Sequence, residues 1–253
     1  MKTHIDLNAD LGEGAPFDAE LMQIISSANI ACGGHIGDTN SIRATVKLAR
    51  DNGVRIGAHP SYPDREHFGR KSLNLTPCQL VFSLTAQLWA IKAVSIEEGV
   101  SVAYVKPHGA LYNDAARDPE LARQIAQMIR EIDPELALMG LAGSELIRAG
   151  REAGLDVIEE GFADRAYLAD GSLMPRDQEG AVLTDPQAVL LQALSLSQRV
   201  DSICLHGDNP EALNQARMLR NGFQQAGIRI CAFADPRDAI VGDAAFNEVQ
   251  DED

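Results

Sequence analysis

The chain begins with a strand-like run, Ile5-Asp6-Leu7-Asn8-Ala9-Asp10-Leu11, followed by Gly12 and Glu13. Its polar residues recur with a period of two, so Asp6, Asn8 and Asp10 share one face of a strand and the apolar residues share the other. Helices cover the outer faces of strands in parallel β/α folds, which leaves the inside of a barrel for the polar face. The run therefore predicts a first strand whose acids point inward, with Glu13 on the loop above it.

The same alternation of strand and helix continues along the chain. β-rich runs occur at about residues 3–9, 28–33, 54–59, 101–107, 135–141, 155–161, 201–206 and 228–233. Helical stripes of apolar residues with three-to-four spacing lie between most of them. This order predicts parallel strands with right-handed crossovers.

Capping residues and glycines indicate where helices begin and end. A capping side chain precedes a proline at Thr76-Pro77, Asp118-Pro119, Asp185-Pro186 and Asn209-Pro210. Gly53, Gly99, Gly154 and Gly227 stand where the helices should stop.

We predict an α/β fold, a single β/α barrel over residues 1–253. The barrel has seven parallel strands, with eight as the alternative and an open doubly wound sheet as the competing architecture. Residues 162–184, rich in Gly, Asp and Pro, are expected to form a long loop near the site, and the acidic tail at about 244–253 is expected to be frayed.

The net charge argues against binding to nucleic acids and membrane surfaces, and the cysteines indicate the cellular compartment. The formal net charge is −15, so nucleic-acid phosphates and anionic membrane surfaces would be repelled. Cys32, Cys78, Cys204 and Cys231 form no CxxC pair, and three lie in apolar strand-like runs, which indicates reduced core thiols and a cytoplasmic location. We see no signal peptide and no apolar stretch near the ~20 residues that span a bilayer.

Histidines and acids collect at the predicted carboxyl ends of the strands, where parallel α/β folds place their chemistry. His35, His59, His108 and His206 each end or follow a strand, and Glu160, Asp164 and Arg165 follow another. One such histidine is more often structural, but four at equivalent positions predict a shared site. Imidazoles there could act as acid or base, or as metal ligands.

Two further motifs suggest anion binding, each with a plainer alternative. Cys32-Gly33-Gly34-His35 precedes a helix that we expect Thr39 or Asn40 to cap, and its N–H groups could hold a phosphate, although such turns are common. Lys106, near His108 and Tyr112, could hold a carboxylate or phosphoryl group, or could pair with Asp6 or Glu160. The chain has no P-loop, GxGxxG, GxSxG or HExxH motif.

Taken together, these motifs resemble the LamB/YcsF family, which includes the A subunit of prokaryotic ATP-dependent 5-oxoprolinase. The likeness runs over nearly the whole chain and is carried by residues 6–13, 29–35, 57–64, 68–70, 105–112, 162–167 and 206–208. Three positions depart from the family pattern: Ala9 replaces a cysteine, Gly34 a phenylalanine and Thr39 a proline. Ala9 argues against a nucleophilic thiol on the first strand.

The resemblance implies a seven-stranded barrel related to sugar deacetylases and glycoside hydrolases. It implies cleavage of 5-oxo-L-proline to L-glutamate coupled to hydrolysis of ATP, which normally acts with Mg²⁺, and it implies partner subunits B and C. We expect no tightly bound metal.

For the chemistry we hypothesise that Asp10 or Glu13 is the general base for water and that His59 or His108 exchanges a proton with the ring nitrogen. Lys106 and Arg70 would hold carboxylate or phosphoryl oxygens. The other residues expected around substrate or phosphate are Asp6, Asn8, Gly33, His35, Tyr112, Glu160, Asp164, Arg165 and His206.

Two alternatives stay open. A metal-dependent amidohydrolase or deacetylase that needs no ATP would also use acids and histidines at a barrel mouth. A non-catalytic subunit that presents substrate to its partners would fit the missing nucleotide motif.

Overall fold

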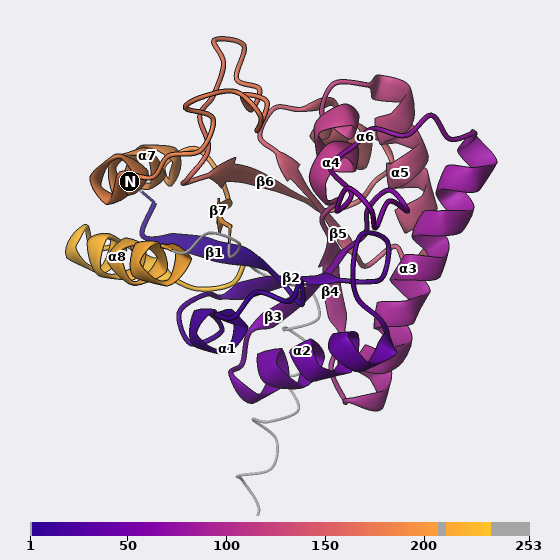
Figure 1. The fold of residues 1–253 in the computed structure, drawn as a ribbon, viewed down its shortest axis with the longest axis horizontal. Coiled ribbons are helices and arrows are strands. Elements are labelled where there is room, and N and C mark those ends of the chain that lie inside the picture. The colour runs from indigo at the N-terminus through magenta and orange to yellow at the C-terminus, as the bar shows by residue number, and fades with distance from the viewer. Residues whose placement is uncertain (1, 207–210, 234–253) are drawn as a thin grey trace, which may run out of the picture.

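The computed structural model describes residues 2–206 and 211–233 and forms a parallel β/α barrel (Figure 1). Seven strands close the ring, because β1 pairs in parallel with both β2 and β7. The ring strands are β1 (His4–Leu11), β2 (Ser27–Ala31), β3 (Arg55–His59), β4 (Val102–Val105), β5 (Ala137–Leu141), β6 (Val157–Phe162) and β7 (Ser202–Leu205). All seven fall within or beside the runs predicted from the sequence.

The eighth predicted strand exists but lies outside the ring. β8 (Arg229–Ile230) pairs only with the start of β1, through His4 and Ile5. The carbonyls of Thr3, Ile5 and Leu7 accept hydrogen bonds from Arg229, Cys231 and Ser26 in turn, so β8 and the start of β2 share one edge of β1. The barrel therefore has seven strands, and β8 is an additional short strand paired with the amino end of β1.

The helices surround the barrel. They are α1 (Asp18–Leu21), α2 (Thr39–Asp51), α3 (Pro77–Glu97), α4 (Gly109–Ala115), α5 (Pro119–Ile132), α6 (Glu145–Glu152), α7 (Pro186–Leu196) and α8 (Ala212–Gln225). Thr76, Asp118 and Asp185 cap α3, α5 and α7 as predicted. The predicted start at Asn209-Pro210 lies outside the described residues, as does the acidic tail.

One predicted cap is wrong by one residue. Asp38, rather than Thr39 or Asn40, caps α2: its carboxylate accepts hydrogen bonds from the N–H groups of Asn40 and Ser41, both at 2.9 Å. The Ser41 hydroxyl accepts in return from the Asp38 N–H, at 2.8 Å. A carboxylate near the positive end of a helix dipole is favourable, which explains the choice.

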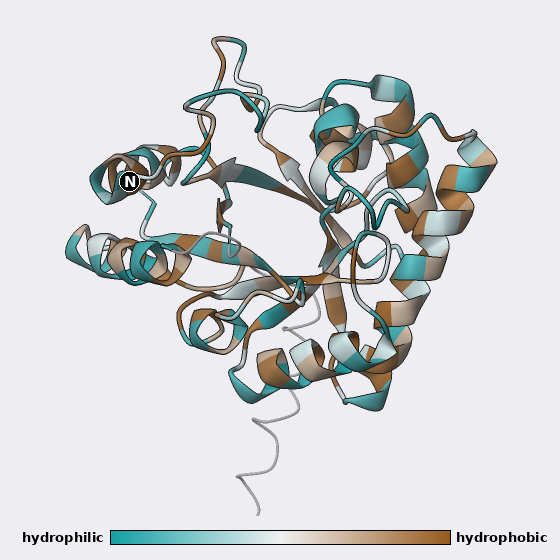
Figure 2. Cartoon of the chain, in the orientation of Figure 1, coloured by the Kyte–Doolittle hydropathy of each residue, from teal (hydrophilic) through white to brown (hydrophobic). Residues whose placement is uncertain are grey.

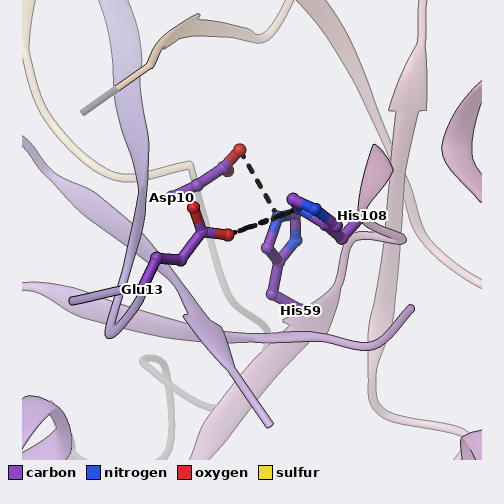
Figure 3. Close-up of side chains that lie close together, drawn as sticks. All are labelled: Asp10, Glu13, His59 and His108. Carbon is purple, nitrogen blue, oxygen red and sulfur yellow. Dashed lines mark hydrogen bonds and ion pairs between the residues drawn. The ribbon is translucent and has the colours of Figure 1, made fainter. Parts of the chain in front are cut away.

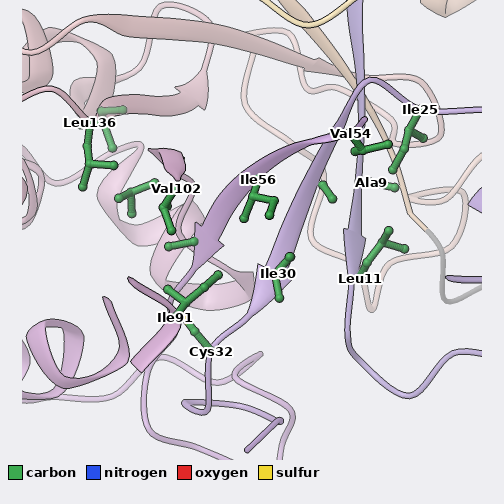
Figure 4. Close-up of a cluster of buried hydrophobic side chains, with 14 of the residues drawn as sticks. Ala9, Leu11, Ile25, Ile30, Cys32, Val54, Ile56, Ile91, Val102 and Leu136 are labelled. Atoms are coloured by element: carbon green, nitrogen blue, oxygen red, sulfur yellow. The ribbon is translucent and has the colours of Figure 1, made fainter. Parts of the chain in front are cut away.

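The apolar core lies between the barrel and its helices. Ile5, Leu7, Ala9 and Leu11 of β1 face outward and are buried in this cluster, which continues through β2, β3, β4 and helix α3 (Figure 4). Figure 2 shows the matching pattern, with hydrophobic helix faces toward the strands. The predicted division of β1 into an apolar outer and a polar inner face is confirmed.

Helix α3 differs from expectation in its composition. It has 21 residues and a mean hydropathy of 1.3 in its most apolar window, so its length and composition alone would allow a membrane span. Its buried side chains include Leu80, Leu84, Leu88 and Ile91, which pack into the core. A mostly apolar core helix passes the same test, so this finding is weak evidence for a span.

The cysteines are all free, as expected, but they are not all in the core. Cys32 and Cys204 are buried, Cys231 is partly buried and Cys78 is exposed at the start of α3.

Candidate active site

Four ionisable side chains from three segments meet at the carboxyl end of the barrel (Figure 3). Asp10 lies at the end of β1, Glu13 follows it, His59 ends β3, and His108 follows β4. The Nε2 of His59 lies 3.4 Å from the Asp10 carboxylate, and the Nδ1 of His108 lies 3.3 Å from the Glu13 carboxylate. The strand-end pattern in the sequence thus predicted a true cluster.

Backbone carbonyls determine which nitrogens of His59 and His108 carry protons. The Nδ1 of His59 lies 2.8 Å from the Lys106 carbonyl, and the Nε2 of His108 lies 3.0 Å from the Phe68 carbonyl. A carbonyl can only accept, so both of these outer nitrogens donate. The inner nitrogens, 3.0 Å apart, then hold lone pairs in the neutral rings and need a shared proton or a cation between them.

The same donor set could hold a metal ion. One ligand atom from each of Asp10, Glu13, His59 and His108 lies within 4.8 Å of every other. Imidazoles that ligate a metal commonly donate their other N–H to a backbone carbonyl, and both histidines do so here. A second group, Asp10 with Cys204 and His206, meets the same distance criterion.

His35 contacts this cluster through Glu13 and His108. Its Nε2 lies 2.8 Å from the Glu13 carboxylate, and its ring stacks on that of His108 with 3.7 Å between centroids. Burial lowers the pKa of His35. Burial and the charges of His59 and His35 hold the pKa of His108 well below its ordinary value, so the His108 ring is neutral near pH 7.

The loop that carries Phe68 is held in a strained conformation. Phe68 has a φ of 55°, which is rare for a residue with a side chain. The Gly69 carbonyl accepts a hydrogen bond from the Ala110 N–H at 2.9 Å, and a Cβ on Gly109 would lie 2.5 Å from that carbonyl oxygen. This close backbone contact positions the Phe68 carbonyl for His108.

Gly34 also permits a close approach. A Cβ there would lie 2.3 Å from the Gln87 side-chain oxygen and 2.4 Å from the Ser61 hydroxyl. The buried Gln87 amide bonds both the N–H and the carbonyl of Ser61, each at 2.9 Å. Gln87 thereby anchors the segment that follows His59.

Lys106 is buried among acids inside the barrel. Its Nζ lies 2.7 Å from the Glu160 carboxylate and 3.2 Å from that of Asp10. Burial opposes the charge, but Asp10 and Glu160 keep the pKa of Lys106 well above its ordinary value. Burial likewise opposes the ionisation of Asp10, whose pKa is nevertheless held well below its ordinary value by His59 and Lys106. The predicted pairing with Glu160 is confirmed, whereas Asp6 is not a partner.

Asp6 lies deeper, toward the amino ends of the strands. Its carboxylate accepts hydrogen bonds from the hydroxyls of Ser26, Ser27 and Ser202. Burial raises its pKa. Asn8 lies along β1 between Asp6 and Asp10, and its side chain is hydrogen-bonded to Glu160 at 2.8 Å and to Asn29 at 2.7 Å.

His206, which lines the cavity, forms a pair with the buried Asp164. The Nδ1 of His206 lies 3.0 Å from the Asp164 carboxylate, and the His206 N–H donates to the same group at 3.2 Å. Burial opposes protonation, but Asp164 raises the pKa of His206 overall. His206 is therefore easier to protonate than His108.

These groups line a cavity of about 710 Å³. The predicted residues that line it are Asp10, Glu13, His59, Arg70, Lys106, His108, Tyr112, Arg165 and His206. Asn8, His35, Glu160 and Asp164 stand behind them, each bonded within this network. The sequence did not predict Arg117 or Arg176, which also line the cavity, because no periodic pattern or motif indicates where their side chains point.

Gly33 and Arg165 are placed differently from expectation. The Gly33 N–H is bonded to the Ile36 carbonyl at 2.9 Å, so it is not available to a phosphate. Arg165 lines the cavity but donates to the carbonyls of Ala181 and Met174, which makes it a brace for the long connection between β6 and α7. A larger cavity, about 1000 Å³, lies at the opposite end of the barrel and contains none of the histidine cluster.

Comparison with known proteins identifies the family. The LamB/YcsF family model matches residues 5–238. The chain belongs to the LamB/YcsF family. It is similar to the lactam utilization protein of Thermus thermophilus, with 39% identity over 92% of this chain and 100% of that chain and a TM-score of 0.84.

More distant structures share the fold of this LamB/YcsF protein. The catalytic domain of a peptidoglycan N-acetylglucosamine deacetylase from Eubacterium rectale has 11% identity over 92% of this chain and 90% of that chain, with a TM-score of 0.54. The Xyl-CE4 domain of a xylanase from the hindgut metagenome of Trinervitermes trinervoides has 14% identity over 96% and 92%, also with a TM-score of 0.54. The predicted deacetylase-type barrel is confirmed.

Proposed function

We propose that this protein is the A subunit of an ATP-dependent 5-oxoprolinase, which opens the lactam of 5-oxo-L-proline to give L-glutamate. The observation that carries the proposal is the acid–imidazole cluster, Asp10, Glu13, His59 and His108, at the carboxyl end of a LamB/YcsF barrel. The printed description of its Thermus thermophilus relative, a lactam utilization protein, supports the substrate class.

The cavity offers the groups that amide hydrolysis needs. A base takes a proton from water, the water oxygen adds to the lactam carbonyl carbon, the C–N bond breaks, and the ring nitrogen takes up a proton. Asp10, kept ionised by Lys106 and His59, or Glu13 beside it, would accept the water proton. His206 and His108 differ in pKa, and the raised pKa of His206 makes it the better donor to the nitrogen.

A divalent cation at Asp10, Glu13, His59 and His108 would polarise a carbonyl oxygen or a bound water. The donor set fits such an ion, since it offers two imidazole nitrogens and two carboxylates. The described residues contain no glycine-rich phosphate cradle, so ATP coupling and the partner subunits B and C enter the proposal through the family resemblance, and no step is derived through ATP.

Reconstitution tests the proposal. The chain would be purified with subunits B and C, and glutamate release from 5-oxoproline would be measured with and without ATP. We expect release only with all three proteins and ATP, and a loss of about 10²–10⁴-fold in the Asp10→Asn and His108→Ala variants. Full turnover in both variants would instead support a non-catalytic, substrate-presenting chain.

The second candidate is a metal-dependent amidohydrolase that needs no ATP. The observation in its favour is the pair of inner imidazole nitrogens 3.0 Å apart beside two carboxylates. Metal analysis of the purified chain, followed by amide hydrolysis without ATP, separates it from the first. Hydrolysis that depends on the metal and not on ATP would select it.

A further inference from the structure

Four arginines line the site cavity, of which Arg70 and Arg117 are exposed, Arg176 is partly exposed and Arg165 is buried. They come from three separate segments and are Arg70 after β3, Arg117 after α4, and Arg165 and Arg176 in the connection between β6 and α7. We call them the guanidinium rim. The chain holds 22 Lys and Arg against 37 Asp and Glu, so composition alone does not explain a concentration of arginines here.

Another part of the cavity lining consists of acids and imidazoles instead of guanidinium groups. Asp10, Glu13, His59 and His108 form the acid–imidazole end, and Lys106 there is already paired with Glu160 and Asp10. An anionic group would be repelled by those carboxylates. The cavity is therefore polarised, with groups for chemistry inside and cationic groups at its rim.

Two members of the rim, Arg165 and Arg176, are close enough to affect one another. Burial lowers the pKa of Arg165, and the nearby charge of Arg176 lowers it further. Arg165 donates to the carbonyls of Ala181 and Met174, and the buried Asp164 carboxylate lies close enough to interact with the charges of both Arg165 and Arg176. The cavity lining also contains the carboxylates Asp114 and Asp177, of which Asp114 accepts a hydrogen bond from Tyr62 at 3.1 Å. An anion that binds at the rim therefore shares these guanidinium groups with nearby carboxylates.

We propose that the guanidinium rim, through Arg117 and Arg176, binds the oxyanion of a small-molecule ligand whose uncharged end reaches the acid–imidazole cluster. Guanidinium groups bind carboxylate and phosphate oxygens in bidentate geometry, which fixes orientation as well as position. The substrate carboxylate and a nucleotide phosphate share this chemistry. The choice of a lactam as the uncharged end rests on the proposed function, whereas the anion site does not.

Binding to the isolated full chain tests the inference. Calorimetric titrations would compare 5-oxoproline with pyrrolidin-2-one, which lacks the carboxylate, and ATP with adenosine, which lacks the phosphates. The variants are Arg117→Gln, Arg176→Gln and their double. Arg123→Gln on α5 is the matched control, since it removes one exposed guanidinium that is paired with Glu120 away from the cavity.

We expect the double variant to bind one of the two anions, 5-oxoproline or ATP, at least tenfold more weakly than the wild type does. We expect Arg123→Gln to leave both affinities unchanged. Weaker 5-oxoproline binding with no change for pyrrolidin-2-one identifies the carboxylate as the ligand, and weaker ATP binding with no change for adenosine identifies the phosphates. Unchanged affinity for both anions in a double variant that unfolds at the wild-type temperature overturns the inference, as does the absence of anion binding by the wild type. Turnover by the reconstituted complex is measured separately, so a failure of the proposed function is recognised on its own.

Discussion

The Nε2 of His59 and the Nδ1 of His108 lie 3.0 Å apart, although each ring donates its other N–H to a backbone carbonyl. Two neutral rings in this arrangement would direct lone pairs at one another. The arrangement is favourable only with a proton or a cation between the rings, and the nearby Asp10 and Glu13 carboxylates stabilise either one.

Removal of one of these rings should weaken divalent-ion binding. We expect His108→Ala to lower the affinity for Zn²⁺ or Co²⁺ at least tenfold, because the set loses a nitrogen ligand. Titration of the purified chain measures this, and His67→Ala is the control, since the partly exposed His67 pairs with Asp64 outside the cluster. Equal affinities in the two variants would argue that the cluster shares a proton instead.

Neutralising one partner of the barrel ion pair should destabilise the fold. Lys106→Met leaves Glu160 and Asp10 as buried charges without their cation, and such a loss typically costs about 3–5 kcal/mol. Lys106→Met combined with Glu160→Gln should recover part of that loss. Urea unfolding of the single and double variants checks this, and a double variant no more stable than Lys106→Met would contradict it.

The backbone contact at Gly109 should not tolerate a side chain. Gly109→Ala places a Cβ 2.5 Å from the Gly69 carbonyl oxygen at a φ of 58°. Gly143 has a φ of 73° and open space around it, so Gly143→Ala shows the backbone cost alone, about 1–2 kcal/mol. We expect thermal unfolding to show a larger loss for Gly109→Ala, and similar losses would mean that the loop moves aside freely.

The Asp164–His206 pair should make stability depend on pH. His206 has a raised pKa when folded, so its contribution is complete below its ordinary value of 6.5 and is lost as pH rises through the folded value. Asp164 has a lowered pKa, so its contribution is present above 3.8 and is lost as pH falls through the folded value.

The pair therefore stabilises the fold most between about pH 4 and pH 6.5. We expect His206→Gln to cost about 1.5–3 kcal/mol there and less at higher pH. Unfolding of wild type and variant from pH 4.5 to 9 checks this. A difference in stability between wild type and His206→Gln that does not vary with pH would show that the hydrogen bond, rather than the charge, stabilises the fold.

The sequence predicted the parts of the structure that depend on local pattern. Alternation in β1 predicted which side chains face the inside, and Thr76, Asp118 and Asp185 predicted three helix starts. Contacts between side chains on different strands were harder to predict from the sequence. The end of a strand indicates that His59 and His108 are near one mouth, but their spacing depends on the register between β3 and β4 and on the strained loop at Phe68.

Loop side chains were the hardest to predict. Arg117 follows a short helix and Arg176 lies within a long connection, and in such segments no period relates a residue to the cavity. Lys106 could have paired with either of two acids by sequence, and only the geometry selects Glu160 and adds Asp10.

The close approach at Gly34 has an evolutionary consequence. The family resemblance leads us to expect a phenylalanine at position 34, but the space that a side chain on Gly34 would need is filled by Gln87 and Ser61. The two positions are therefore expected to covary: relatives with a large residue at 34 need a smaller or differently directed one at 87. Gly34→Phe alone is therefore expected to destabilise this chain, whereas the same change with a smaller residue at 87 is expected to cost less.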